Sequence, residues 1–161
     1  MDLVKAEQLA IELMNKHNLI DNGWQFEFDN AKRRFGGCNY TWKKITLSKH
    51  LVQLNDEFQV KDTILHEIAH ALVGHKHGHD SYWRMKAREI GCNGDRCYSS
   101  DLPKPTPNYI GTCPNGHEFK RLRLSLSTRK GSCTKCDKKY NPNFLLVWKK
   151  INHEYDPNME R

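Results

Sequence analysis

Two histidines and a glutamate follow one another with the spacing His66-Glu67-Ile68-Ala69-His70, inside an apolar run that favours a helix. In a helix of about 3.6 residues per turn, His66 and His70 lie on one face, one turn apart. Two imidazoles in that position can bind the same zinc ion, and Glu67 beside them can accept a proton from water that the metal activates. The pattern therefore predicts a catalytic zinc centre with Glu67 as general base.

A catalytic zinc needs a third protein ligand and keeps one position open. Downstream of His70, the residues that could supply this ligand are His75, His77, His79 and Glu89. Glu89 lies nineteen positions after His70, a spacing at which one class of zinc peptidases supplies a glutamate from a second helix. These residues alone leave the choice open.

A second group of ligands lies near the C-terminus, where Cys113 and His117 form one pair and Cys133 and Cys136 another. Two such pairs predict a structural zinc with four protein ligands, so we expect two zinc ions per chain. Strands predicted at residues 119–126 and 144–148 would make this segment a small β zinc ribbon, with too little core to fold without metal. The other cysteines, Cys38, Cys92 and Cys97, have no paired cluster, and we expect buried or free thiols.

The elements that must position the first site are predicted from periodicity and capping residues. A helix is expected at residues 3–17, strands at 24–29, 35–40 and 44–48, and a short helix at 49–54. Asp62 is the candidate N-cap of the helix with the histidines, which should end near Gly74. Asp80 or Ser81 should begin another helix, ended by Gly91, with Trp83 on its inner face. The predicted class is α+β, with helices packed on a small antiparallel sheet.

Aromatic residues at positions 24–42 alternate with basic ones, which favours a sheet core with a polar outer face; stacking of nucleic-acid bases is the alternative. The segment 101–107 contains three prolines and cannot be helical. We therefore predict a core at residues 1–102, a linker at 103–108, the ribbon at 109–150 and a tail at 151–161.

The net charge of +7 is concentrated in the last third of the chain. Residues 109–161 hold eleven Lys and Arg against five acidic residues, whereas residues 1–108 are nearly balanced. This distribution favours a polyanionic partner such as nucleic acid, with a basic surface that only aids solubility as the alternative. Phosphate contacts would give salt-dependent, largely sequence-independent binding. The predicted contact residues are Lys120, Arg121, Arg123, Arg129, Lys130, Lys135, Lys138 and Lys139.

The sequence has no run of eighteen apolar residues, so no membrane span is expected. The first residues lack a basic stretch followed by an apolar one, which is the pattern of a secretory signal. Six cysteines without such a signal favour an intracellular protein, cytoplasmic in a prokaryote or virus and nuclear in a eukaryote. We expect a monomer.

Two motifs together resemble a known family. The segment His66-Glu67-Ile68-Ala69-His70-Ala71, followed by Gly78-His79-Asp80-Ser81-Tyr82-Trp83, is similar to the SprT-like zinc metallopeptidases. Ile45-Thr46-Leu47-Ser48 resembles the strand before the family's leading helix, and the Cys/His cluster resembles the zinc ribbon of several members. Asp80 departs from the pattern, because a glycine is common there.

The resemblance implies a zincin-like core, with His79 as the third zinc ligand and Trp83 as the aromatic residue of the following helix. It also implies proteolysis of DNA-bound or DNA-crosslinked proteins, with single-stranded or damaged DNA as partner. Two alternatives stay open at this point. One is a nucleic-acid-binding zinc protein with a weak or inactive peptidase core, and the other is a peptidase that uses Glu89 as ligand.

Overall fold

The computed structural model describes residues 1–96 and 102–151, so Cys97 and the tail from residue 152 lie outside the described residues. The chain divides into two compact units, Met1–Pro105 and Thr106–Arg161. The division falls inside the segment predicted as a Pro-rich linker. Among the described residues, no helix combines the length and the apolar character needed to cross a membrane.

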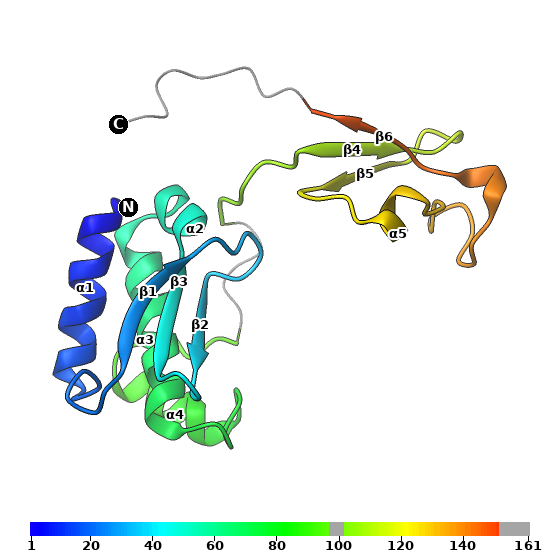
Figure 1. Cartoon of the computed structure of the whole chain (residues 1–161). Helices are drawn as coiled ribbons and strands as arrows, with labels where there is room; N and C mark the ends of the chain where they lie inside the picture. Colours follow the sequence, from blue (N-terminus) through cyan, green and yellow to red (C-terminus); the bar gives the residue numbers. More distant parts are fainter. Residues whose placement is uncertain (97–101, 152–161) are drawn as a thin grey trace. The chain divides into compact units, whose positions relative to one another are not determined.

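Unit 1 contains a three-stranded sheet formed by β1 (Gln25–Asp29), β2 (Gly36–Asn39) and β3 (Lys44–Ser48), in the order β1-β3-β2. β2 and β3 are antiparallel, but β1 and β3 are parallel, so the prediction of a purely antiparallel sheet is wrong. The reason is the strand order, because β2 does not lie next to β1: β3, whose Ile45 and Leu47 are fully buried, lies between them (Figure 1). β3 returns antiparallel to β2 and so runs in the direction of β1.

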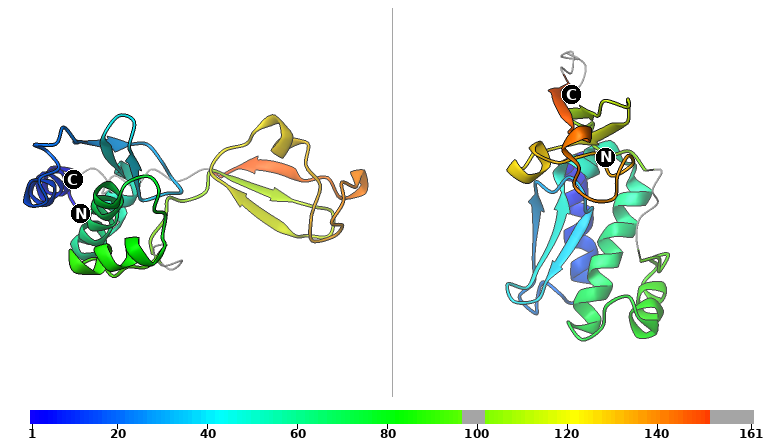
Figure 2. Two further views of the ribbon diagram at one scale, coloured as in Figure 1. Left: turned by 90° about the horizontal axis from the view of Figure 1, so that it is seen from below. Right: turned by 90° about the vertical axis from the view of Figure 1, so that its right-hand side faces the viewer.

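Four helices complete unit 1: α1 (Leu3–Lys16), α2 (Lys49–Leu54), α3 (Glu57–Val73) and α4 (Ser81–Glu89). α1 and α3 cover the same face of the sheet, as the right-hand view of Figure 2 shows. Ile64 and Ile68 of α3 are fully buried in the core with Ile45 and Leu47 of β3. The α+β class is confirmed, and the boundaries of these elements are close to those predicted.

The start of α3 differs from the prediction. The helix begins at Glu57, and its N-cap is Asp56, whose carboxylate accepts a hydrogen bond from Gln59 N at 2.9 Å. Asp62 is therefore not the cap. Its carboxylate accepts from Asn93 N at 2.8 Å and so fastens the chain after α4 to the side of α3. Asp56 and Asp62 both fit the capping pattern in the sequence. Val60, which lies between them, is buried in the core, so the helix includes it and begins after Asp56.

Unit 2 is a second three-stranded sheet, antiparallel throughout, formed by β4 (Tyr109–Thr112), β5 (Glu118–Arg121) and β6 (Val147–Lys150) in the order β5-β4-β6. The predicted strand at 119–126 ends at Arg121, and Leu126 instead begins the short helix α5 (Leu126–Arg129) with 78% of its surface exposed. The predicted strand at 144–148 begins only at Val147, because a 3-10 turn (Pro142–Phe144) precedes it.

The small core of unit 2 forms where Trp148 crosses β4 at Gly111. A Cβ atom at Gly111 would lie 2.7 Å from the indole ring, so the position requires glycine for space. The indole Nε1 of Trp148 donates to Thr128 O at 3.1 Å, which ties β6 to α5.

Candidate metal centre

His66, Glu67 and His70 lie on the last turns of α3, where the apolar residues between them face the core. Gly74 ends the helix with a φ of +82°, a conformation that side chains disfavour, and its N–H donates to His70 O at 3.0 Å. The helix thus places the two imidazoles one turn apart and leaves them at its surface.

His79 completes the group from the loop between α3 and α4. Asp80, the next residue, caps α4 by accepting from Trp83 N at 2.9 Å, and this cap fixes the direction of the loop. The three Nε2 atoms converge, with 3.3 Å between His66 and His70, 3.1 Å between His70 and His79, and 2.9 Å between His79 and His66. Nitrogens bound tetrahedrally to zinc at the usual bond length lie about 3.3 Å apart, so the group fits one such ion.

The imidazoles are held in the neutral form that binds metals. Burial, together with the neighbouring rings of His70 and His79, lowers the pKa of His66 to about 3. Burial and the neighbouring His79 lower the pKa of His70 to about 4. The pKa of His79 is lowered by burial and by the charge of Arg96. No proton has to leave these rings near neutral pH before a cation binds.

Trp83 of α4 packs against the rings of all three histidines. Its side chain is fully buried, and its ring centroid lies 4.6 Å from those of His66 and His79 and 5.1 Å from that of His70, on which it stacks. This buried indole restricts the rotation of the imidazoles and so keeps their Nε2 atoms directed toward one point.

Glu67 lies beside the histidines with only 7% of its surface exposed. Burial raises the pKa of its carboxyl to about 8, although the charge of Arg34 acts in the opposite direction. A carboxyl with a pKa near neutrality, next to a group of metal ligands, suits a residue that takes up and releases a proton.

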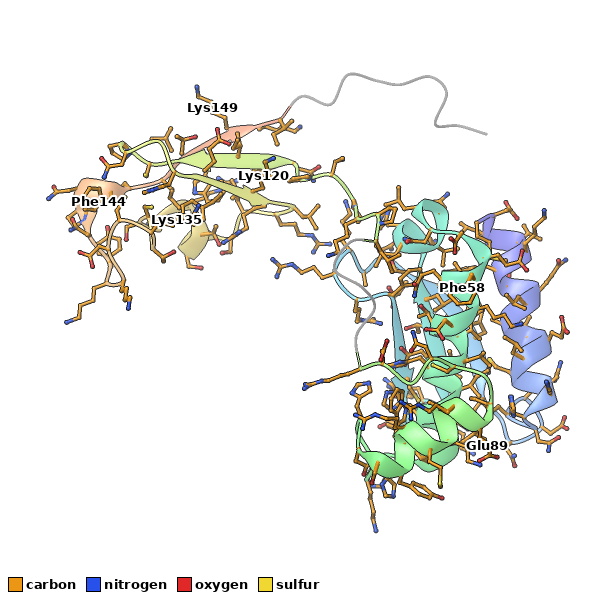
Figure 3. All side chains as sticks on the ribbon, turned by 180° about the vertical axis from the view of Figure 1, so that it is seen from behind. Phe58, Glu89, Lys120, Lys135, Phe144 and Lys149 are labelled. Atoms are coloured by element: carbon orange, nitrogen blue, oxygen red, sulfur yellow. The ribbon has the colours of Figure 1, made fainter. Side chains whose placement is uncertain are left out.

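The other candidate third ligands lie elsewhere. Glu89 is the last residue of α4 and forms an ion pair with Lys86 at 2.7 Å (Figure 3). His77 pairs with Asp80 through Nδ1 at 2.8 Å, and His75 contacts the ring of Tyr40 with 6.1 Å between centroids. Within the described residues, the groups that could hold a metal are the His66, His70 and His79 group and the Cys/His cluster of unit 2.

The three histidines and Glu67 face a cleft of about 550 Å³. One wall is the chain from Arg33 to Tyr40, which includes β2, and the other is formed by the loops at 75–79 and 93–96. Gln59 and Thr63 of α3 also line the cleft. A cleft beside a buried carboxyl and a group of metal ligands can admit a segment of another molecule.

The second group of ligands brings together Cys113, His117, Cys133 and Cys136, all within 4.8 Å of one another. The sulfurs of Cys113 and Cys136 are 3.7 Å apart, and His117 Nδ1 lies 3.2 to 3.6 Å from the three sulfurs. For tetrahedral zinc, the expected spacings are about 3.8 Å between sulfurs and about 3.5 Å between sulfur and nitrogen. The donor set and its dimensions therefore fit zinc.

The remaining cysteines of the described part are free thiols. Cys92 is buried and Cys38 is partly buried, and burial raises the pKa of both thiols to about 12. Thiols of this kind are poor nucleophiles and poor metal ligands at neutral pH.

The predicted phosphate-contacting residues are all exposed, but they do not share one face. The strand register puts Lys120 and Lys149 beside Ile110 on one face of the ribbon sheet. Arg121 lies on the other face with Phe119, over whose ring the Lys135 Nζ is 5.6 Å from the centroid. Figure 3 shows Lys149 and Lys135 on opposite sides of this sheet.

The sequence did not identify the wall residues of the cleft: Tyr40 was expected in a sheet core, and Cys38 was expected to be a buried or free thiol. Tyr40 in fact donates its hydroxyl hydrogen to His70 O at 3.2 Å and so joins the end of β2 to the end of the ligand helix. The available signal was the pair Gly36-Gly37 inside a strand, because glycine in a strand often marks a close approach by another group.

The sequence profile of the SprT-like family matches residues 7–103, which is more than half of the chain. The matched region contains all of α3 and α4 and the three converging histidines. The ribbon lies beyond the match. No curated protein matches the chain.

Proposed function

The chain belongs to the SprT-like family, and we propose that it is a zinc-dependent endopeptidase with a zincin-like core that cleaves DNA-bound or DNA-crosslinked proteins. The observation that carries the peptidase proposal is the convergence of the three Nε2 atoms beside a buried glutamate on the same helix. A structural site closes with four protein ligands, whereas this group offers three and opens to a cleft.

His66, His70 and His79 would hold zinc through their neutral Nε2 atoms. Zinc bound there would act as a Lewis acid that polarises the scissile carbonyl and lowers the pKa of water. Glu67 accepts the proton of the attacking water and passes it to the leaving amine, and its carboxyl is suited to both steps because burial holds the pKa near neutrality. Trp83 keeps water away from the back of the ligand group.

The proposed role of unit 2 is to recruit DNA. Its described part carries ten Lys and Arg and two acidic residues, which attracts a polyanion. Tyr109 and Phe119 lie on the same face as Arg121, and aromatic rings next to basic side chains are the usual combination for single-stranded nucleic acid. We expect binding by a monomer, with little sequence preference.

The proposal is tested by following cleavage of a basic, DNA-bound protein with and without single-stranded DNA. The zinc-loaded wild type should cleave it, and Glu67→Gln should retain zinc and lose cleavage. Glu89→Gln is the matched control, because it neutralises an exposed carboxylate on α4 that pairs only with Lys86 in the described structure. Cleavage by Glu67→Gln at the wild-type rate would refute the mechanism.

The DNA part is tested separately by the salt dependence of binding. A single lysine or arginine that contacts a phosphate of single-stranded DNA contributes about 0.7 to the slope of log K against log salt concentration. Arg121→Ala and Lys120→Ala remove one charge from each face of the sheet, so the variant with the smaller slope identifies the bound face. Tight DNA binding without any cleavage would instead support a nucleic-acid-binding zinc protein with an inactive core.

A further inference from the structure

Gly36, the first residue of β2, lies directly against the side chain of Glu67. A Cβ atom at Gly36 would be 2.7 Å from Oε1, 2.8 Å from Cγ and 3.0 Å from Cδ of Glu67. Distances under 3.0 Å essentially never occur for real Cβ atoms. Gly36 is not among the glycines with a positive φ, so this position requires glycine for space and not for its backbone conformation.

The side chains that face α3 become larger along β2 and the residue that follows it. Gly36, Cys38 and the following Tyr40 alternate along the chain and all line the cleft. Tyr40 reaches the end of α3 at His70. Gly36, the residue without a side chain, lies against Glu67, about one helical turn before His70 on α3.

Glu67 has little else to fix its direction. In the described part of the chain, its carboxylate makes no hydrogen bond, and Arg34 acts on it through charge. With 7% of its surface exposed, the side chain is confined by its neighbours, and Gly36 of β2 is one of them. A methyl group at Gly36 would therefore push the carboxylate away from β2.

We propose that Gly36 is a positioning residue for Glu67. Its missing side chain lets the carboxylate rest against β2, at the depth from which it takes the proton of the attacking water. The role in the reaction rests on the proposed peptidase function, whereas the contact between Gly36 and Glu67 can be tested without it.

The first test compares the zinc-loaded full chain with its Gly36→Ala variant. The added methyl group should displace the carboxylate and lower kcat by at least about tenfold, because small displacements of a reacting group are costly. KM and zinc content should stay close to wild type. Gly37→Ala is the control on the same strand, since its Cβ would meet Arg34 Nη1 at 2.5 Å and Thr46 Oγ1 at 3.2 Å instead of the side chain of Glu67. A much smaller loss of kcat is expected there.

An unchanged kcat in Gly36→Ala would overturn the proposal. Loss of zinc from this variant would also overturn it, because the glycine would then serve the ligand group and not the general base. A loss of kcat as large in Gly37→Ala would show that any methyl group on β2 is harmful, and it would count against a specific contact.

The second test uses stability and needs no activity. Gly36→Ala should lower the melting temperature of the wild type but have little effect in a Glu67→Ala background, where the colliding atoms are gone. An equal decrease in melting temperature in both backgrounds would refute the proposed contact between Gly36 and Glu67. If Gly36→Ala does not fold, recovery of folding in the double variant supports the proposal and continued failure refutes it. If the wild type cleaves no protein, the proposed peptidase function is refuted. The comparison of the single and double variants still shows whether Gly36 contacts Glu67.

Discussion

The buried carboxyl of Glu67 should destabilise the metal-free protein, and Glu67→Gln should remove that cost. Burial raises the pKa of this carboxyl from 4.5 to about 8 in the folded state. Between these values the folded protein binds more protons than the unfolded chain, so the contribution of Glu67 to stability falls as the pH rises. Above pH 4.5 the folded protein must either ionise the Glu67 carboxyl in a site with 7% exposure or keep it protonated, and both cost free energy relative to the unfolded chain.

The magnitude follows from the shift. One pKa unit corresponds to about 1.4 kcal/mol, so the whole shift is worth about 5 kcal/mol once the carboxyl is fully ionised. Near neutral pH, where ionisation is incomplete and the cleft is partly hydrated, we expect Glu67→Gln to raise the free energy of unfolding by about 2–4 kcal/mol. The difference should shrink to below about 1 kcal/mol at pH 5 and vanish near pH 4, below the unfolded pKa of 4.5, where the carboxyl is protonated in both the folded and the unfolded state.

The assay is urea unfolding of the metal-free full chain, followed by far-UV circular dichroism, which reports the helices of unit 1. Wild type and Glu67→Gln are compared from about pH 4 to about pH 8, a range that includes both pKa values. The three histidines titrate in the opposite sense, but they are present in both proteins and cancel in the difference. Bound zinc should narrow the gap, because a cation favours the carboxylate. A pH-independent gap, or a less stable variant at neutral pH, would refute this reasoning.

Three further outcomes are expected. Asp56→Ala should lower the free energy of unfolding by about 1 kcal/mol without loss of zinc, measured by urea titration, because it removes the N-cap of α3; no effect would show that the helix begins elsewhere. His79→Ala should lose one zinc ion by native mass spectrometry, whereas Glu89→Ala should retain both; the reverse result would assign the ligand to α4. Cys133→Ser should lose the other zinc and expose Trp148 to solvent, seen as a red shift of its fluorescence, and a folded ribbon without metal would contradict the proposed dependence on zinc.

The parts of the fold that depend on local pattern were predictable. The strand at 44–48 and the helix at 49–54 have the expected boundaries, and Asp80 is the predicted cap of α4. The strand order was not predictable, because it depends on which strand has the most apolar face once the sheet is assembled. The boundaries of the ribbon strands differ from the prediction because unit 2 has only a small core. Leu126 therefore does not continue a strand with a buried face but lies exposed on α5.

The ligand sets could be found because their spacing is a property of the chain itself. His66 and His70 needed only the helical repeat, and His79 needed the resemblance of its loop to a known motif. The wall of the cleft could not be found in this way. Gly36 and Tyr40 are separated from Glu67 and His70 by about thirty residues, and their contacts exist only because β2 is the strand next to α3.

The placement of Trp83 beneath the ligand group has an optical consequence. Indole emission depends on the local electric field, and this indole has three imidazoles within 4.6 to 5.1 Å of its centroid. Arrival of a doubly charged ion among those rings changes that field far more than it does at Trp24 or Trp42, which make no ring contact with the three histidines in the described part of unit 1. The protein thus contains an intrinsic fluorophore at its metal centre, so that occupancy can be titrated in solution without a dye, a label or a substrate.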